Sequence, residues 1–123
     1  MPGVGDGQSC KMVASTYSWT VAPSANDVIQ SALIQSGSVI TDVVIVHSGL
    51  GASGTFRVGY GLDDDYFVVS ASQATAGVVR MSAATALPLV LTANDTVDVT
   101  VNVAGASATG TIAIIVYFQS RNA

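Results

Sequence analysis

T-V-D-V-T-V-N-V-A-G-A-S-A-T-G-T-I-A-I-I-V-Y-F, residues 96–118, is the stretch of this chain that decides its fold. Its first part alternates valine with Asp98, Thr100 and Asn102, which is typical of a β-strand with one buried face. The middle part carries glycines at both ends and suits a flexible hairpin loop. The sequence therefore predicts that residues 96–103 and 111–118 form a closing hairpin.

The second strand of this pair is apolar on both faces. One face carries Ile112, Ile114, Val116 and Phe118, and the other carries Ala113, Ile115 and Tyr117. A strand with two apolar faces needs cover on both sides. The domain's own core can cover only one of them. We therefore predict that Ala113, Ile115 and Tyr117 contact a second layer, a neighbouring subunit or another protein.

The rest of the chain has the same β character. Runs rich in β-branched and aromatic residues predict strands at 12–21, 27–35, 39–47, 55–60, 66–70, 78–82 and 87–91, separated by turn residues. Such spacing predicts an all-β fold, an antiparallel β-sandwich of about eight strands that is jelly-roll-like. The strand order is left open. We expect residues 1–26 to form an extended N-terminal arm and the first strand, and residues 27–123 to form the β-sandwich domain.

Composition points to a protein that spends its time packed against something else. The 123 residues fit one domain, half of them are apolar, and only 10% are charged. Ordinary soluble domains carry roughly 25% charged residues. The net charge is −4, and the four cations Lys11, Arg57, Arg80 and Arg121 are scattered. Because phosphate binding needs clustered cations, no nucleic-acid partner is expected.

The sequence also predicts no membrane segment. Residues 1–7 lack the basic and apolar regions of a signal peptide. The uncharged window 99–120 contains Asn102, two glycines and several hydroxyls, whereas a spanning helix needs about 20 predominantly apolar residues. We expect synthesis in the cytoplasm and no membrane association.

Residues that carry chemistry are few. Asp63, Asp64 and Asp65 are acids that Ca²⁺ favours, but three consecutive acids on one loop are not expected to face one ion. A solvated turn is the simpler interpretation, with a metal site as the alternative. The single histidine, His47, ends a strand and is expected at the surface or a sheet edge. With no nucleophile elbow in the sequence, we predict no enzyme and no cofactor.

Aromatic residues supply the remaining candidates. Tyr17 and Trp19 are interface candidates, because tyrosine and tryptophan are enriched at protein contacts. For Trp19 a place in the core or at its edge is the favoured interpretation, with the interface as the alternative. A carbohydrate-binding β-sandwich is the alternative from another functional class, with Tyr17, Trp19, Tyr60 or Tyr66 as the sugar platform.

Four phrases give the chain a family resemblance. They are G-S-V-I-T-D-V-V-I at 37–45, S-G-T-F-R-V-G-Y at 53–60, L-T-A-N-D-T-V-D-V-T-V at 91–101 and A-T-G-T-I-A-I-I-V-Y-F at 108–118. Over residues 27–118 the chain resembles small virion structural proteins of tailed bacteriophages. These are the capsid decoration (cement) and the head-fibre or neck-associated proteins.

The resemblance implies a β-sandwich subunit of the virion, often trimeric, that is assembled in the host cytoplasm. On this basis we expect a capsid decoration protein that binds the major capsid protein or another virion protein and forms a homo-oligomer, with a trimer favoured. A head fibre, spike, neck or tail component is the alternative within the virion.

Overall fold

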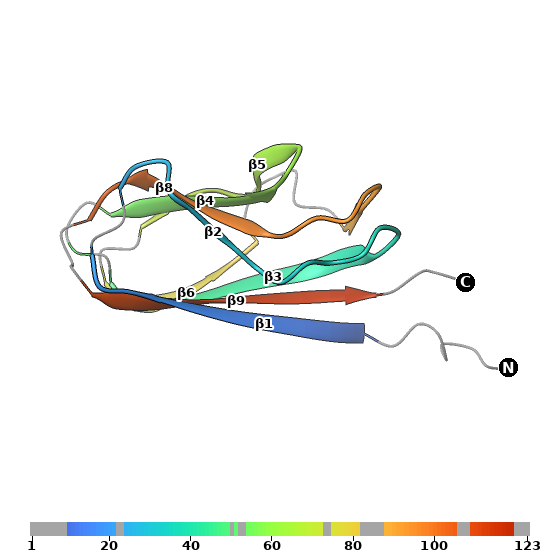
Figure 1. The fold of residues 1–123 in the computed structure, drawn as a ribbon, viewed down its shortest axis with the longest axis horizontal. Helices are drawn as coiled ribbons and strands as arrows, with labels where there is room; N and C mark the ends of the chain where they lie inside the picture. The colour runs from blue at the N-terminus through green and yellow to red at the C-terminus, as the bar shows by residue number, and fades with distance from the viewer. Residues whose placement is uncertain are drawn as a thin grey trace, which may run out of the picture.

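The computed structural model describes residues 10–21, 24–49, 51, 54–72, 75–81, 88–105 and 109–119. Within them the chain forms nine strands and no helix: β1 Cys10–Trp19, β2 Val28–Gln30, β3 Val39–His47, β4 Thr55–Tyr60, β5 Asp63–Ser72, β6 Gly77–Arg80, β7 Leu89–Val90, β8 Asp98–Val103 and β9 Gly110–Gln119. Figure 1 shows them as two sheets stacked face to face, with β1, β9 and β3 in one layer and β4, β5 and β8 in the other.

The connectivity is that of a jelly roll. One sheet has the order β1-β9-β3-β6, and the other has the order β2-β8-β4-β5. The short strand β7 also pairs with β3, at Val39 and Ile40, whereas β6 pairs further along β3, from Val44 to His47. Because β6 and β7 share one side of β3, nine strands occupy eight positions. The predicted all-β, jelly-roll-like sandwich is confirmed.

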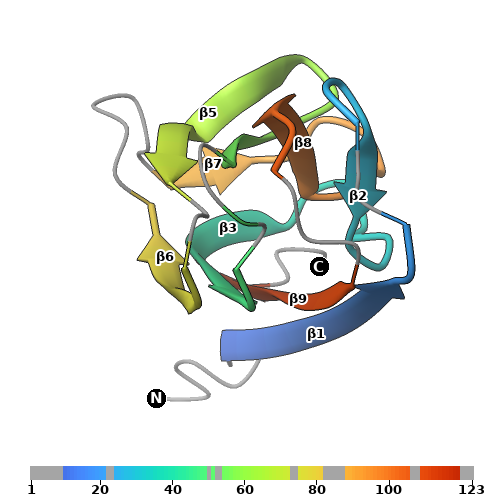
Figure 2. The same cartoon turned by 90° about the vertical axis from the view of Figure 1, so that its left-hand side faces the viewer.

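The core lies between the two sheets and is built from their inner faces. Ile112, Ile114 and Val116 of β9 turn inward, and so do Val97 and Val99 from the opposite layer. Phe56 and Phe67 are fully buried among them. Figure 2, a view along the strands, shows the two layers on either side of this core. Period-2 alternation, with one face per strand turned inward, is therefore the pattern that assembles the fold.

The predicted closing hairpin is wrong. β8 pairs with β2 and β4, whereas β9 pairs with β1 and β3 in the opposite sheet. The two strands therefore turn their apolar faces toward each other across the core and exchange no ladder bonds. Alternation reports which face of a strand is buried and carries no information about its hydrogen-bonding neighbours. The two strands that flank the glycine-containing stretch consequently lie in different sheets.

Several element boundaries differ from those predicted. β3 and β4 match the prediction, but β2 ends at Gln30. Beyond it, the Ser31 amide donates to the Val97 carbonyl and Ile34 forms an isolated bridge with Asp95. β5 begins at Asp63, so the aspartates predicted to form a loop begin a strand. The lack of a side chain at Gly59 allows β5 to approach β4 this closely, since a Cβ at position 59 would lie 2.1 Å from the Asp63 carbonyl oxygen.

The N-terminal strand belongs to the sandwich. β1 begins at Cys10 and pairs along its full length with β9, from Cys10 opposite Gln119 to Trp19 opposite Gly110. Residues 1–9 of the predicted arm lie outside the described residues. In the part of the chain that the structure describes, no helix is long and apolar enough to cross a bilayer.

Candidate interaction surface

The outer face of the β1-β9-β3-β6 sheet is an apolar surface. Neighbouring strands place Ala14, Ile115, Val44 and Arg80 in one row across the sheet, and Thr16, Ala113, Val46 and Val78 in the next. The side chains in the centre are apolar. We name this the apolar face and define it by Met12, Ala14, Val44, Val46, Val78, Ala113, Ile115 and Tyr117.

Exposure on the apolar face increases from its centre to its margins. Ala113, Ile115 and Tyr117 are half-buried by their neighbours within the sheet. Met12, Val46 and Val78 are 55%, 41% and 61% exposed. The structure therefore places the three predicted β9 residues together on an outward surface. The surrounding exposed residues are ones that the sequence did not single out, although their alternation along β1, β3 and β6 carried the signal.

The charges on this face are already paired. Arg80 lies opposite Val44, and its Nη1 donates to Asp42 Oδ2 at 2.9 Å. Val44, directly opposite Arg80 in the ladder, is only 6% exposed although it lies on the outer face. A partner that covered the apolar face would therefore meet apolar side chains and, at the margin, one ion pair whose two charges neutralise each other.

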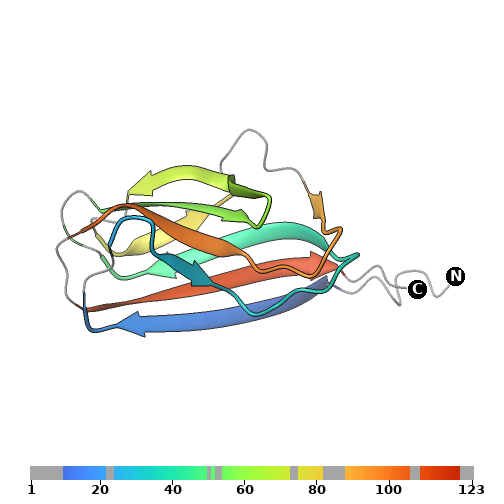
Figure 3. The same ribbon diagram turned by 45° about the horizontal axis from the view of Figure 1, so that its top comes forward.

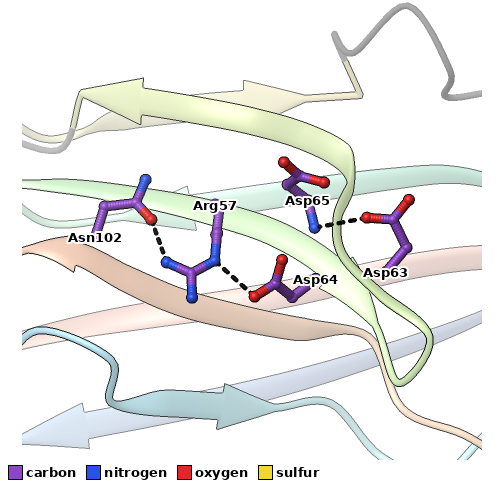
Figure 4. A network of polar contacts seen from close by, with 5 residues as sticks. All are labelled: Arg57, Asp63, Asp64, Asp65 and Asn102. Carbon is purple, nitrogen blue, oxygen red and sulfur yellow. Dashed lines mark hydrogen bonds and ion pairs between the residues drawn. The ribbon is translucent and has the colours of Figure 1, made fainter.

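The outer face of the other sheet is polar. Arg57 on β4 donates from Nε to Asp64 Oδ2 at 2.9 Å and from Nη1 to Asn102 on β8 (Figure 4). Asp98 accepts a hydrogen bond from the Thr96 hydroxyl at 2.6 Å, and partial burial raises the pKa of its carboxyl. The two outer faces therefore differ in chemistry: this one combines a polar network with the exposed valines Val28 and Val69, whereas the centre of the other is apolar.

The carboxylates of the aspartate run, residues 63–65, lie closer together than predicted. One carboxylate oxygen from each of Asp63, Asp64 and Asp65 lies within 4.8 Å of the others, although three consecutive acids were not expected to converge. The irregular β4–β5 ladder, with register shifts along it, allows this. However, Arg57 already binds Asp64, and Asp63 accepts from the Asp65 amide at 3.3 Å. A hydrogen bond to Asp63 is the main cause of the raised pKa of Asp65.

Trp19 is part of the chain's own core. It is 5% exposed and lies directly over Gly110 of β9. Tyr17 stacks beside it, with ring centroids 6.4 Å apart, and is half-exposed. Both line a cavity of about 470 Å³ between the β1 and β2 edges, together with Asp27 and Gln30. Within this chain Trp19 therefore lies in the core, as one of its two interpretations predicted.

The aromatic residues of the carbohydrate hypothesis do not gather in one place. Tyr60 and Tyr66 pack edge to face at 5.6 Å and contact Phe67 at the β4–β5 turn. Tyr17 lies on β1 in the opposite sheet. A sugar platform built from all four aromatics is therefore not present in the described residues. Of the four, Tyr17 and Trp19 share a cavity.

His47 is buried, not exposed as predicted. It is 5% exposed, meets Phe56 edge to face at 5.6 Å, and its Nδ1 is 3.1 Å from the Ser48 carbonyl oxygen. Its position in β3 puts it on the inward face with Val43 and Ile45, whereas Asp42 is on the outer face. Alternation therefore separates His47 from Asp42, and the two cannot act as a catalytic pair.

Comparisons with known proteins find the fold again in phage particles. No protein-family model and no curated protein matches the chain. Among solved structures, it is similar to a chain of the cyanophage Pam1 capsid asymmetric unit, with a TM-score of 0.83 and 22% identity over 98% of this chain and 91% of that one.

Two further capsid structures contain similar chains. A chain of the Ralstonia phage GP4 capsid gives a TM-score of 0.69 and 20% identity, covering 100% of this chain and 92% of that one. A chain of the acidic stable capsid of Helicobacter pylori bacteriophage KHP30 gives 0.59 and 16%, covering 92% and 95%. At these identities the likeness establishes a shared fold over nearly the whole chain.

Proposed function

We propose that this protein is a structural component of a tailed-phage virion, a capsid decoration protein that binds the outer shell through its apolar face. The observation that carries the proposal is the full-length likeness to chains from three phage capsid structures. Its partner is then the major capsid protein or another virion protein, and its location is the assembled virion. No enzymatic activity is part of the proposal.

The chemistry of the apolar face supports a docking role. Met12, Val46 and Val78 are exposed, and each would be removed from water by a covering subunit. Burial contributes about 25 cal/mol for each Å² of apolar surface, before the cost of association is subtracted. A shell repeats one contact many times with symmetry, so individually weak contacts hold the particle together collectively.

Shell binding tests the proposal directly. Shells that lack this protein are mixed with the purified protein, and the bound fraction is measured by co-sedimentation. Val78→Lys and Val69→Lys are a matched pair, because both valines lie on edge strands and are 61% and 57% exposed, but Val69 belongs to the polar sheet. We expect Val78→Lys to weaken binding about tenfold or more and Val69→Lys to leave it unchanged.

Other outcomes separate the alternatives. Full binding by both Val78→Lys and Val46→Lys, with unchanged thermal stability, would show that the apolar face does not dock. Recovery of the protein with fibres, spikes, necks or tails, and not with heads, would favour the alternative within the virion. Glycan binding that is lost in Tyr17→Ala would favour the carbohydrate alternative.

A further inference from the structure

Strand β1 is a long, unprotected sheet edge. It pairs with β9 on one side and ends the sheet on the other, as Figure 3 shows. Its ten residues, C-K-M-V-A-S-T-Y-S-W, contain no proline or glycine and one charge, and the register with β9 runs without a bulge. Proteins commonly protect such edges with prolines, charges, bulges or shortness. Apart from Lys11, β1 carries none of these four protections. The segment after β2 does contact β1, but its hydrogen bond, from the Ala32 amide to the Ser15 hydroxyl at 2.9 Å, goes to a side chain.

The other described edges are protected. β2 has three residues and β6 has four. β5 is as long as β1, but its ladder with β4 shifts register twice and its first three residues are aspartates. Among the strands that the structure describes, β1 is therefore the edge best suited to pair with a further strand.

The backbone groups that face the free edge can be identified. Ser48 and Thr111 are linked by a backbone bond of 2.9 Å from Ser48 N to Thr111 O, and the Tyr117 carbonyl accepts from Thr41. Thr111 and Tyr117 therefore turn their backbone polar groups toward β3. Because these groups alternate between the two sides of a strand, Ile112, Ile114 and Val116 turn theirs toward β1.

The β1–β9 register then shows which backbone amides and carbonyls of β1 face the free edge. Ile112, Ile114 and Val116 lie opposite Tyr17, Ser15 and Val13, so these odd-numbered residues use their amides and carbonyls in the β1–β9 ladder. The even-numbered residues Met12, Ala14, Thr16 and Ser18 consequently direct their backbone donors and acceptors to the free edge. Their side chains lie on the apolar face.

We infer that this edge pairs with β1 of a second copy of the chain, antiparallel and around a twofold axis at Ala14. Antiparallel pairing about residue 14 sets Ala14 opposite Ala14 and Met12 opposite Thr16. All of these are residues whose backbone groups face the edge, so each opposed pair can exchange two hydrogen bonds. The small Ala14 side chains meet at the axis without crowding.

Charge complementarity supports the second copy as the occupant. In this register Lys11 of one copy lies opposite Tyr17 of the other. Tyr17 and Asp27 line the same cavity beside the β1 edge, and Asp27 accepts from the Ser24 amide through Oδ2. We therefore expect the Lys11 ammonium of one copy to approach the Asp27 carboxylate of the other. The twofold axis repeats this contact, which gives two favourable charge pairs in one interface.

The inference does not rest on the proposed function. It concerns the edge of the sheet, and shell docking concerns its face. A twofold contact also differs from the threefold assembly that the resemblance implies, because pairing an edge with its own copy closes at two subunits. The pair would join two apolar faces into one continuous surface.

The experiment is solution mass against concentration, with amide exchange measured by NMR. We expect a dimer and concentration-dependent protection of the Ala14 and Thr16 amides, while the Val13, Ser15 and Tyr17 amides are protected at every concentration. Ala14→Pro removes a donor from the free edge only, and Ala14→Ser retains it. We expect Ala14→Pro to weaken dimerisation about tenfold or more and Ala14→Ser to leave it close to wild type.

Other results would overturn the inference. A monomer at all accessible concentrations, a trimer, or a dimer that Ala14→Pro leaves intact would each exclude pairing through β1. If Ala14→Pro fails to fold, charge reversal serves instead. Lys11→Glu and Asp27→Lys should each weaken the dimer by roughly threefold or more, and the double variant should restore it. Single variants that dimerise as the wild type does would exclude this register.

Discussion

Trp19 and Gly110 lie opposite each other in the β1–β9 ladder, and the indole covers the glycine. A Cβ at position 110 would lie 2.3 Å from Cζ2 of Trp19 and 2.8 Å from the Ser48 hydroxyl oxygen. At this end of the ladder the indole can therefore pack directly on the backbone, because residue 110 has no Cβ. Trp19 owes its place in the core to this glycine.

Gly110→Ala should destabilise the fold, because the added methyl forces the indole out of its packed position. Overpacking of this kind costs about 1–3 kcal/mol of unfolding free energy, measured by urea denaturation. Gly77→Ala is the control, since a Cβ there would make an ordinary 3.7 Å contact with His47. Equal stability of the two variants would mean that the indole can move aside freely.

Asp98 should make stability depend on pH. Burial is the main cause of its raised pKa, so the folded state binds a proton more tightly than the unfolded chain does. Its contribution to stability is therefore full below the unfolded pKa, near 3.8, and is lost as pH rises through the folded pKa.

Asp98→Asn tests this dependence, because asparagine keeps an oxygen acceptor for the Thr96 hydroxyl. We expect the variant to be more stable than the wild type at pH 7, with the difference shrinking as pH falls toward 4. Chemical denaturation across this range measures it. A difference that stays constant with pH would assign the effect to packing.

The Arg57–Asp64 pair should contribute little to stability. The Arg57 side chain is 23% exposed and that of Asp64 is 58% exposed, so solvent screens the pair. A double-mutant cycle with Arg57→Gln and Asp64→Asn should give a coupling free energy of about 0.2–1 kcal/mol. The coupling should decrease in 1 M salt, and a larger salt-independent value would indicate a buried network.

Calcium should leave the melting temperature unchanged, because Arg57 already occupies one oxygen of Asp64. Thermal unfolding with millimolar Ca²⁺ and with a chelator measures this, and Asp63→Asn is the control for the carboxylate cluster. A rise in melting temperature with Ca²⁺ that disappears in the control would establish a cation site at Asp63, Asp64 and Asp65.

The sequence predicted the faces of strands better than their neighbours. Alternation correctly marked Val97 and Val99 as buried, and β3 and β4 have the predicted bounds. It could not reveal that β8 and β9 belong to different sheets, since pairing depends on contacts between distant segments.

His47 shows a different kind of error. It shares a face with Val43 and Ile45, but both faces of this strand are largely apolar, so alternation did not show which face is inward, and its place at the strand end favoured the surface. Phe56, from a later strand, covers the ring. The burial of His47 therefore depends on packing across the two sheets, which the sequence pattern did not show. The apolar face was predictable in part, because Ala113, Ile115 and Tyr117 were identified, whereas Met12 and Val78 required the sheet order.

The pairing of β1 with β9 governs when this chain can fold. The first strand of the sandwich has its ladder partner at the other end of the sequence. During synthesis β1 must therefore remain unpaired until β9 has left the ribosome, and β3 lacks its neighbour on one side until then. Closing so long a loop is slow, and both edges are open to wrong partners meanwhile. We expect the β1-β9-β3-β6 sheet to form only after β9 has been synthesised, and chains truncated before β9 to aggregate.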